Sequence, residues 1–238
     1  MGKNLIQQRR GRGTKTYTSP SFRFKGEVKH YPVDAAGTVV DILHCAGHSA
    51  PLMAVSYDTG DVGLHFAPEG IKVGDELSVG GVVDVSIKPR LGDVRMLRDI
   101  PEGTLINNLE LRPGDGGKLV RSSGVFAKLV SKSEKEVRVL LPSRKEKIFT
   151  PDCRASIGLL SGAGRTEKPF LKAGTRFFRM KAKNKLYPRV CGISMNAVDH
   201  PFGGKCSHIK GRPTQSPRSA PPGRKVGKIA PKRTGRRR

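Results

Sequence analysis

Acidic side chains are missing from both ends of this 238-residue sequence. No Asp or Glu precedes Glu27 and none follows Asp199, although residues 205–238 alone carry twelve Lys or Arg. The net charge of +25 therefore sits in the two ends and in residues 161–199, because residues 27–160 are nearly neutral. A chain with this distribution repels itself unless a polyanion neutralises it. The phosphates of nucleic acid take up Lys and Arg in this way and release counterions.

Other scarcities exclude further classes of protein. There is no Trp, and aromatic residues make up 5% of the chain, which predicts a modest core. No apolar run approaches the roughly 18 residues of a membrane span, and the basic N-terminus lacks the apolar stretch of a signal peptide, so we expect neither membrane insertion nor secretion. The four cysteines lie far apart and are expected to be reduced thiols. They are Cys45, Cys153, Cys191 and Cys206.

Residues 27–90 have the pattern of a small β-barrel. Short apolar runs rich in Val and Ile are separated by Gly, Pro and Asp, which is typical of antiparallel strands. The expected strands are Gly37–Leu43, Met53–Tyr57, Val62–Phe66, Leu77–Val79 and Val82–Ile87. Five short strands in this length predict an OB-fold-like RNA-binding domain.

Residues 91–165 predict a second, SH3-like barrel. The expected strands are Thr104–Ile106, Leu119–Arg121, Val125–Val130, Glu136–Leu141 and Glu146–Phe149, with a hairpin turn at Ser131–Lys135 and a Gly-rich loop at Arg112–Gly117. Short turns are expected near Asp152–Leu159 and no long amphipathic helix anywhere. The fold class is therefore all-β, flanked by a basic N-terminal extension (residues 1–26) and a basic C-terminal extension (residues 166–238). We expect both extensions to order on a partner, because neither has the composition to form its own core.

The sequence motifs that would indicate a catalytic, nucleotide-binding or metal-binding site are mostly incomplete. The string GDGGK at Gly114–Lys118 lacks the Ser or Thr that a phosphate-binding P-loop needs after its Lys. The Cys and His residues are not spaced in the tight pairs of a zinc site, so zinc is not expected. His200 has Asp199 and Ser194 nearby but no nucleophile elbow around it. Its expected role is to stack on, or hydrogen-bond to, a base or phosphate.

The basic segments favour RNA. A solvated charged face normally carries both signs, and here long stretches carry one. Helix-turn-helix, zinc-finger and basic-zipper patterns are missing, whereas Gly- and Arg-rich extensions suit irregular RNA. In the segment TRFFRM, Phe177 and Phe178 would either stack on bases or pack against a barrel, and the sequence does not choose between these.

Several strings resemble the L-two family of universal large-subunit ribosomal proteins. They include MNAVDHPFGG at Met195–Gly204, YPRV at Tyr187–Val190, PGRKVG at Pro222–Gly227, RRGRGTK at Arg9–Lys15 and CRASIG at Cys153–Gly158. The resemblance covers essentially the whole chain, and Ala197 and Phe202 are similar to the archaeal and eukaryotic branch. Together with the chain length, this leads us to expect an archaeal source. Cys191 and Lys205 depart from the residues that the family often has there.

The resemblance implies an OB-fold barrel followed by an SH3-like barrel, with both termini threaded into large-subunit rRNA. It implies a cytoplasmic, ribosomal location near the peptidyl transferase centre and the subunit interface, with neighbouring ribosomal proteins and the small subunit as further partners. No cofactor is expected, apart from Mg²⁺ or K⁺ shared with rRNA. Within the loop, Gly203 and Gly204 would let the backbone approach phosphates, and Asp199 would accept hydrogen bonds from the loop's backbone or a neighbouring Arg.

The expected RNA-binding residues combine the basic segments with this loop. They are Arg9, Arg10, Arg12, Lys15, Arg176, Arg179, Lys181, Lys183, Lys185, Arg189, Met195, Asn196, His200, Gly203, Gly204, Lys205, Arg212, Arg218, Arg224, Lys225, Lys232, Arg233 and Arg236. No catalytic residue is expected. Two alternatives remain open: His200 as a general base in peptidyl transfer, and a non-ribosomal basic nucleic-acid-binding protein.

Overall fold

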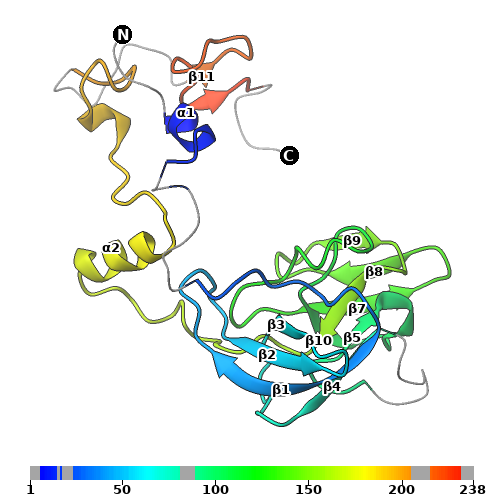
Figure 1. The fold of residues 1–238 in the computed structure, drawn as a ribbon. Helices are drawn as coiled ribbons and strands as arrows, with labels where there is room; N and C mark the ends of the chain where they lie inside the picture. Colours follow the sequence, from blue (N-terminus) through cyan, green and yellow to red (C-terminus); the bar gives the residue numbers. More distant parts are fainter. Residues whose placement is uncertain (1–5, 15–16, 18–23, 81–88, 205–214, 232–238) are drawn as a thin grey trace. The chain divides into compact units, whose positions relative to one another are not determined.

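The computed structural model describes residues 6–14, 17, 24–80, 89–204 and 215–231, and it divides into two compact units (Figure 1). One unit spans residues 20–171 and the other combines residues 1–19 with residues 172–238. Strands dominate the first unit, and the expected all-β class is confirmed. Among the described residues, no helix combines the length and apolarity that crossing a membrane requires.

The first half of the larger unit is an antiparallel sheet whose strands follow the order β3-β2-β1-β4. These are β1 Ala35–Leu43, β2 Leu52–Tyr57, β3 Val62–Phe66 and β4 Glu76–Val79. The register of β1 on β2 shifts between Val39 and Asp41, so Val40 is the extra residue of a β-bulge. A bulge interrupts the alternation of buried and exposed side chains, and Val40 is accordingly exposed while Val39 is buried.

Two short strands join this half to the next. Strand β5 (Val94–Met96) pairs in parallel with β4 and antiparallel with β10 (Arg154–Ile157), and β10 also pairs with β6 (Leu105–Asn107). The described strands of this unit therefore form one ten-stranded sheet in the order β3-β2-β1-β4-β5-β10-β6-β7-β8-β9. The junction is internal to a sheet, so the two halves share backbone hydrogen bonds.

The second half continues with β7 (Ala127–Lys132), β8 (Val137–Leu140) and β9 (Glu146–Phe149). Its register shifts between Leu129 and Ser131, which makes Val130 a second bulge with an exposed side chain. Each half has its own buried cluster. Val39, Met53, Val55, Leu77 and Val79 belong to the first, and Ile106, Leu129, Val137, Val139 and Phe149 belong to the second.

The strand predictions differ from the structure in three places. Leu119–Arg121 is no strand: Leu119 makes a single isolated bridge with Leu109. The turns expected at Asp152–Leu159 were wrong, because β10 lies there, and the sequence analysis also missed β5. β5 and β10 pair with each other although they lie far apart in the sequence, and long-range pairing leaves no local signal. The expected strand Val82–Ile87 lies outside the described residues.

The smaller unit holds two helices and a pair of very short strands. Helix α1 is Ile6–Gly11 and helix α2 is Ala173–Ala182, while 3-10 turns are found at Leu97–Asp99 in the larger unit and Gly192–Ser194 in this one. Strands β11 (Gln215–Ser216) and β12 (Lys228–Ile229) pair in parallel. The sequence analysis missed α2. It is a ten-residue helix with none of its residues buried, and it lies in the basic segment that was expected to be an irregular extension.

Candidate nucleic-acid interface

Helix α2 presents basic side chains with no acidic residue in the helix. Arg176, Arg179 and Lys181 belong to α2, and Lys183 caps its C-terminal end. Burial lowers the pKa of Lys183, and the positive charges of Arg179 and Lys185 lower it further. An anion bound near Lys183 would offset the repulsion from these neighbouring cations and so stabilise its charged form. The arrangement suits a polyanion.

The two phenylalanines of α2 are exposed. Phe177 is 42% and Phe178 is 67% accessible, and their rings meet edge to face with centroids 5.5 Å apart. The sequence left open whether these rings pack against a barrel or stack on bases. Neither ring is buried in the structure, which favours stacking on a nucleic-acid base.

Four cations from different segments line one groove in the smaller unit. Arg10 of α1 and Arg176 of α2 lie on it, together with Lys185 and Arg189 from the chain that follows α2. All four were expected from the sequence as RNA-binding residues. The same groove contains Tyr17 and Tyr187, which sequence reasoning did not select because a lone tyrosine carries no pattern.

The loop Met195–Gly204 is closed by its own backbone. The N–H groups of Asp199 and His200 donate to the carbonyl O of Asn196 at 3.0 and 3.2 Å, and the N–H of Gly204 donates to the carbonyl O of Met195 at 3.1 Å. These bonds bring the end of the loop back to its beginning. The chain here is a compact turn whose polar side chains project from a fixed backbone.

The structure shows why residues 203 and 204 of this loop are both glycine. A Cβ at Gly203 would collide with the carbonyl group of Asn196, and one at Gly204 would stand 2.9 Å from the Cβ of Ala197. Gly204 also has a φ of +82°, which side-chain-bearing residues rarely adopt. The closure of the loop on itself therefore requires both glycines. Their approach to phosphate stays a prediction.

His200 is oriented by its own loop. Its Nδ1 accepts a hydrogen bond from the N–H of Phe202 at 3.1 Å, its ring lies 5.1 Å from that of Phe202, and it fills the space over Gly192 that a Cβ would need. Because Nδ1 accepts, the proton of the neutral ring is on Nε2. His200 can thus offer an N–H donor to a partner while its lone pair is already engaged.

The strand pair β11–β12 presents further cations. The Oγ of Ser216, which is buried, accepts from the N–H of Val226 at 3.0 Å, and the N–H of Ala230 donates to the carbonyl O of Ser216 at 2.8 Å. This holds a turn on which Arg218, Arg224 and Lys225 are exposed. Arg9 and Arg12 are likewise exposed at α1. The remaining expected contacts lie outside the described residues: Lys15, Lys205, Arg212, Lys232, Arg233 and Arg236.

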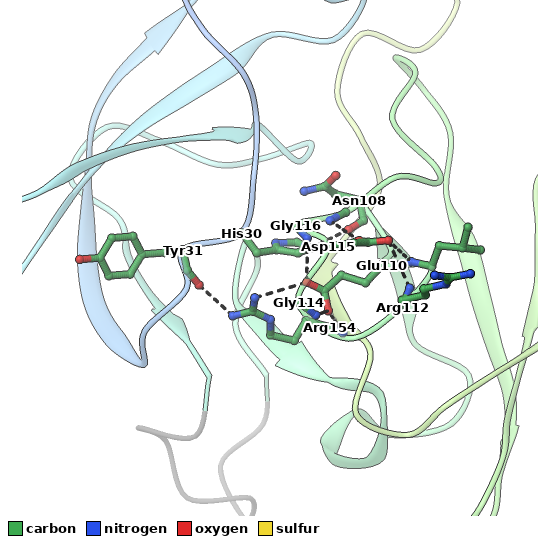
Figure 2. Close-up of polar contacts among 11 residues, drawn as sticks. His30, Tyr31, Asn108, Glu110, Arg112, Gly114, Asp115, Gly116 and Arg154 are labelled. Atoms are coloured by element: carbon green, nitrogen blue, oxygen red, sulfur yellow. Dashed lines mark hydrogen bonds and ion pairs between the residues drawn. The ribbon is translucent and has the colours of Figure 1, made fainter.

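The Gly-rich loop Arg112–Gly117 does not present its backbone to a ligand. Glu110, which is fully buried, accepts from the N–H of Gly114 at 3.2 Å and of Gly116 at 3.1 Å, and Asp115 accepts from the N–H of Gly117 at 3.0 Å (Figure 2). Burial raises the pKa of Asp115, but backbone hydrogen bonds from Gly117, Leu111 and Arg112 outweigh it, so the pKa is lowered. The donors that would bind phosphate are occupied by the chain's own carboxylates. This supports the rejection of a P-loop.

Glu110 also connects this loop to other parts of the larger unit. It forms an ion pair with Arg154 of β10 at 3.3 Å and accepts from the N–H of Arg154 at 2.9 Å, while Arg154 donates to the carbonyl O of Tyr31 at 2.8 Å (Figure 2). Figure 2 shows His30 close to the same group, and its Nε2 donates to the carbonyl O of Asn108 at 2.7 Å. These contacts hold the segment before β1 against the second half of the sheet.

No metal site is evident in the parts of the chain that the structure describes. They contain no group of three or more His, Cys, Asp or Glu residues placed to hold an ion. Cys45 instead lies 3.1 Å from Nδ1 of His48, and Cys153 lies 3.1 Å from the hydroxyl of Thr150, with both cysteines buried and free. The expectation of no cofactor stays a prediction.

Comparison with known proteins places this basic chain in a family. The family described as Ribosomal Proteins L2, C-terminal domain, matches residues 90–223. The large ribosomal subunit protein uL2 of Haloarcula marismortui is 50% identical, covering 99% of this chain and 98% of its own. The uL2 proteins of Methanothermobacter thermautotrophicus and Methanosphaera stadtmanae are 49% and 50% identical over the full length of both chains.

This likeness defines the class first: the chain is a ribosomal protein of the large-subunit type. More particularly, it belongs to the uL2 family, and the relatives named above are archaeal. The resemblance found in the loop and basic strings is thereby confirmed. The RNA contacts of individual residues stay predictions.

Proposed function

We propose that this chain is a structural component of the large ribosomal subunit that binds large-subunit rRNA. The observation that carries the proposal is the clustering of exposed cations on the smaller unit, where α1, α2, the loop Met195–Gly204 and the β11–β12 turn contribute cations or a neutral donor. Asp199 is the only acidic residue among the described residues 172–204 and 215–231. Membership of the uL2 family supports rRNA as the polyanion.

The proposal extends to location and partners. The protein supports the rRNA around the peptidyl transferase centre and the association of the subunits, next to other ribosomal proteins and facing the small subunit. The chemistry of the centre belongs to RNA, and this protein is not an enzyme. The geometry of His200 supports that assignment, because a general base needs a free lone pair and its Nδ1 already accepts from Phe202. Mg²⁺ or K⁺ at the interface would be held jointly with rRNA phosphates.

Binding of the full chain to deproteinised large-subunit rRNA tests the proposal. Small-subunit rRNA and double-stranded DNA of the same length serve as competitors at physiological salt. We expect the large-subunit rRNA to compete at least tenfold better than either, since family-specific contacts add to the shared phosphate attraction. Equal competition by DNA would instead support the alternative of a non-ribosomal basic nucleic-acid-binding protein.

A further inference from the structure

We propose that the groove between α1 and the chain after α2 is a pocket for one unstacked nucleotide of the RNA. Here the pocket is defined by Arg10, Tyr17, Arg176, Met180, Tyr187 and Arg189, with Leu186, Asn184 and Lys185 completing its lining. The inference rests on the proposed rRNA-binding function and deepens it. It concerns side chains, notably Tyr17, Tyr187 and Met180, that were not among the RNA-binding residues expected from the sequence.

The first argument is the pairing of each tyrosine with an arginine. The guanidinium of Arg10 lies 5.3 Å from the ring centroid of Tyr17, and that of Arg176 lies 5.4 Å from the ring centroid of Tyr187. Each pair places a planar cation over a π-face, which holds both groups in a fixed orientation. Arginine planes and aromatic rings are the two surfaces on which unpaired RNA bases stack.

The second argument is the chemistry of the lining. The cations Arg10, Arg176, Lys185 and Arg189 surround the groove, and no acidic residue lines it. Its lining also includes the apolar side chains of Met180 and Leu186, together with the two tyrosines. A nucleotide has the matching parts, since its base is a flat apolar disc with polar edges and its phosphate is an anion. A paired base inside a helix would reach this pocket only at its phosphate.

The third argument separates this pocket from the exposed rings of α2. Phe177 and Phe178 lie on a convex helix surface, where they contact each other. An aromatic ring on a convex surface can stack on any base and therefore does not select one nucleotide. The groove instead encloses its occupant from two segments that lie far apart in the sequence, α1 and residues 184–189. A concave site whose polar groups converge on one occupant is where specificity is expected.

Ultraviolet crosslinking of the native full chain to deproteinised large-subunit rRNA tests the pocket without any substitution. We expect crosslinked peptides that contain Tyr17 or Tyr187, both joined to the same nucleotide. That nucleotide should react with base-modifying reagents in free rRNA and be protected in the complex. Crosslinks from these tyrosines to several unrelated nucleotides, or to paired ones, would overturn the pocket.

Variants provide the second arm. Tyr187→Leu removes the ring and should weaken rRNA binding by roughly 5- to 150-fold, the range for loss of one base–aromatic stack, and should expose the nucleotide to modification again. Tyr187→Phe keeps the ring and should bind like the native chain. Arg176→Lys keeps the positive charge but removes the planar guanidinium. The nucleotide should then become partly reactive to the base-modifying reagents again, while the salt dependence of rRNA binding stays unchanged.

These outcomes distinguish the pocket from the proposed function. If Tyr187→Leu bound as tightly as the native chain and left the nucleotide protected, the pocket would be wrong while rRNA binding stood. If the native chain showed no preference for large-subunit rRNA, the proposed function itself would fail. Circular dichroism of each variant controls for loss of folding, and the native-chain crosslink decides the matter if Tyr187→Leu does not fold.

Discussion

At the scale of single residues, His200 shows how local geometry decides between chemistry and structure. A histidine beside an aspartate and near a serine resembles part of a catalytic set. In the structure the ring is held by the N–H of Phe202 and packs over Gly192, so its orientation comes from its own loop. Since Nδ1 accepts this hydrogen bond, the ring can donate a hydrogen bond from Nε2. This geometry fits the predicted role of hydrogen-bonding to RNA.

Substitution of His200 should therefore affect assembly and not the rate of peptide transfer. We expect His200→Ala to lose order in the surrounding rRNA, at a cost of about 1–3 kcal/mol of local binding. His200→Asn is the matched control, because its Oδ1 can accept from Phe202 as Nδ1 does but cannot act as a base. The single-turnover transfer rate in fully assembled subunits should stay within tenfold for both variants. A loss of a hundredfold or more with intact rRNA protection would establish a base.

Glu110 gives the second prediction at this scale. Its carboxylate is fully buried, pairs with Arg154 and accepts from two backbone N–H groups of the Gly-rich loop. Glu110→Gln leaves the guanidinium of Arg154 without its anion and turns one acceptor into a donor that faces donors. Removing one partner of a buried pair costs about 3–5 kcal/mol.

Chemical denaturation of the full chain at neutral pH measures this loss for Glu110→Gln. The exposed Glu69→Gln is the matched control, and its free energy of unfolding should change by less than about 0.5 kcal/mol. Equal stability of the two variants would mean that the Glu110–Arg154 pair does not stabilise the fold.

At the scale of elements, the sequence predicted most strands and failed at the junction. Strands β1 to β4 and β6 to β9 were expected within two residues of their observed bounds, because short apolar runs between turn residues mark them. β5 and β10 were missed, and both are short strands whose pairing depends on partners distant in the sequence. Long-range pairing leaves no local signal.

The candidate site was predictable to the extent that charge and motif describe it. Arg10, Arg176, Lys185 and Arg189 were selected by charge alone, and the structure brings them to one groove. The two tyrosines of that groove could not be predicted as RNA-binding residues, because their proposed role depends on the arginine that packs against each ring. The self-closure of Gly203 was also invisible, because it depends on a carbonyl seven residues earlier in the chain.

The packing of the segment before β1 against β3 predicts a pH dependence of stability. Burial lowers the pKa of His30 from 6.5 to about 4, and it lowers that of His65 to about 3, with His30 and Arg154 adding to the shift. Between pH 6.5 and pH 4, both rings are therefore neutral in the folded protein but become protonated in the unfolded chain. The unfolded chain binds more protons below pH 6.5, so stability falls as pH falls from 6.5 toward 4 and is fully present above 6.5.

Each neutral ring should contribute a slope of about 1.4 kcal/mol per pH unit within that window. The measurement is the free energy of unfolding of the full chain from pH 8 to pH 4. His65→Gln, whose amide can hydrogen-bond the Tyr57 hydroxyl as the ring Nε2 does, should reduce the slope. Replacement of the exposed His44 by Gln should leave it unchanged, and a flat profile for the native chain would contradict the buried neutral histidines.

At the scale of the whole molecule, the chain has two parts that solve different physical problems. The unit of residues 20–171 buries three apolar clusters, as a domain that folds on its own requires, and it is nearly neutral over most of its length. The remaining chain concentrates cations on short elements with little buried surface. Packing of these segments against each other stabilises them little, because like charges repel, whereas binding to a polyanion stabilises them strongly. The division predicts that affinity and folding can be separated by truncation.

Removal of residues 205–238 should accordingly change the salt dependence of rRNA binding and leave the larger unit folded. If the extensions neutralise about eight phosphates, log affinity should fall against log salt with a slope of roughly −6 to −7 for the full chain. The twelve cations of residues 205–238 are a large share of the positive charge, so the truncated chain should show a clearly flatter slope. Its unfolding free energy, measured by denaturant on the residues that remain, should be unchanged, because the three buried clusters consist of residues that the truncation keeps. An unchanged slope would place the phosphate contacts on the residues that remain, whereas a flatter slope with unchanged stability would establish that residues 205–238 bind RNA.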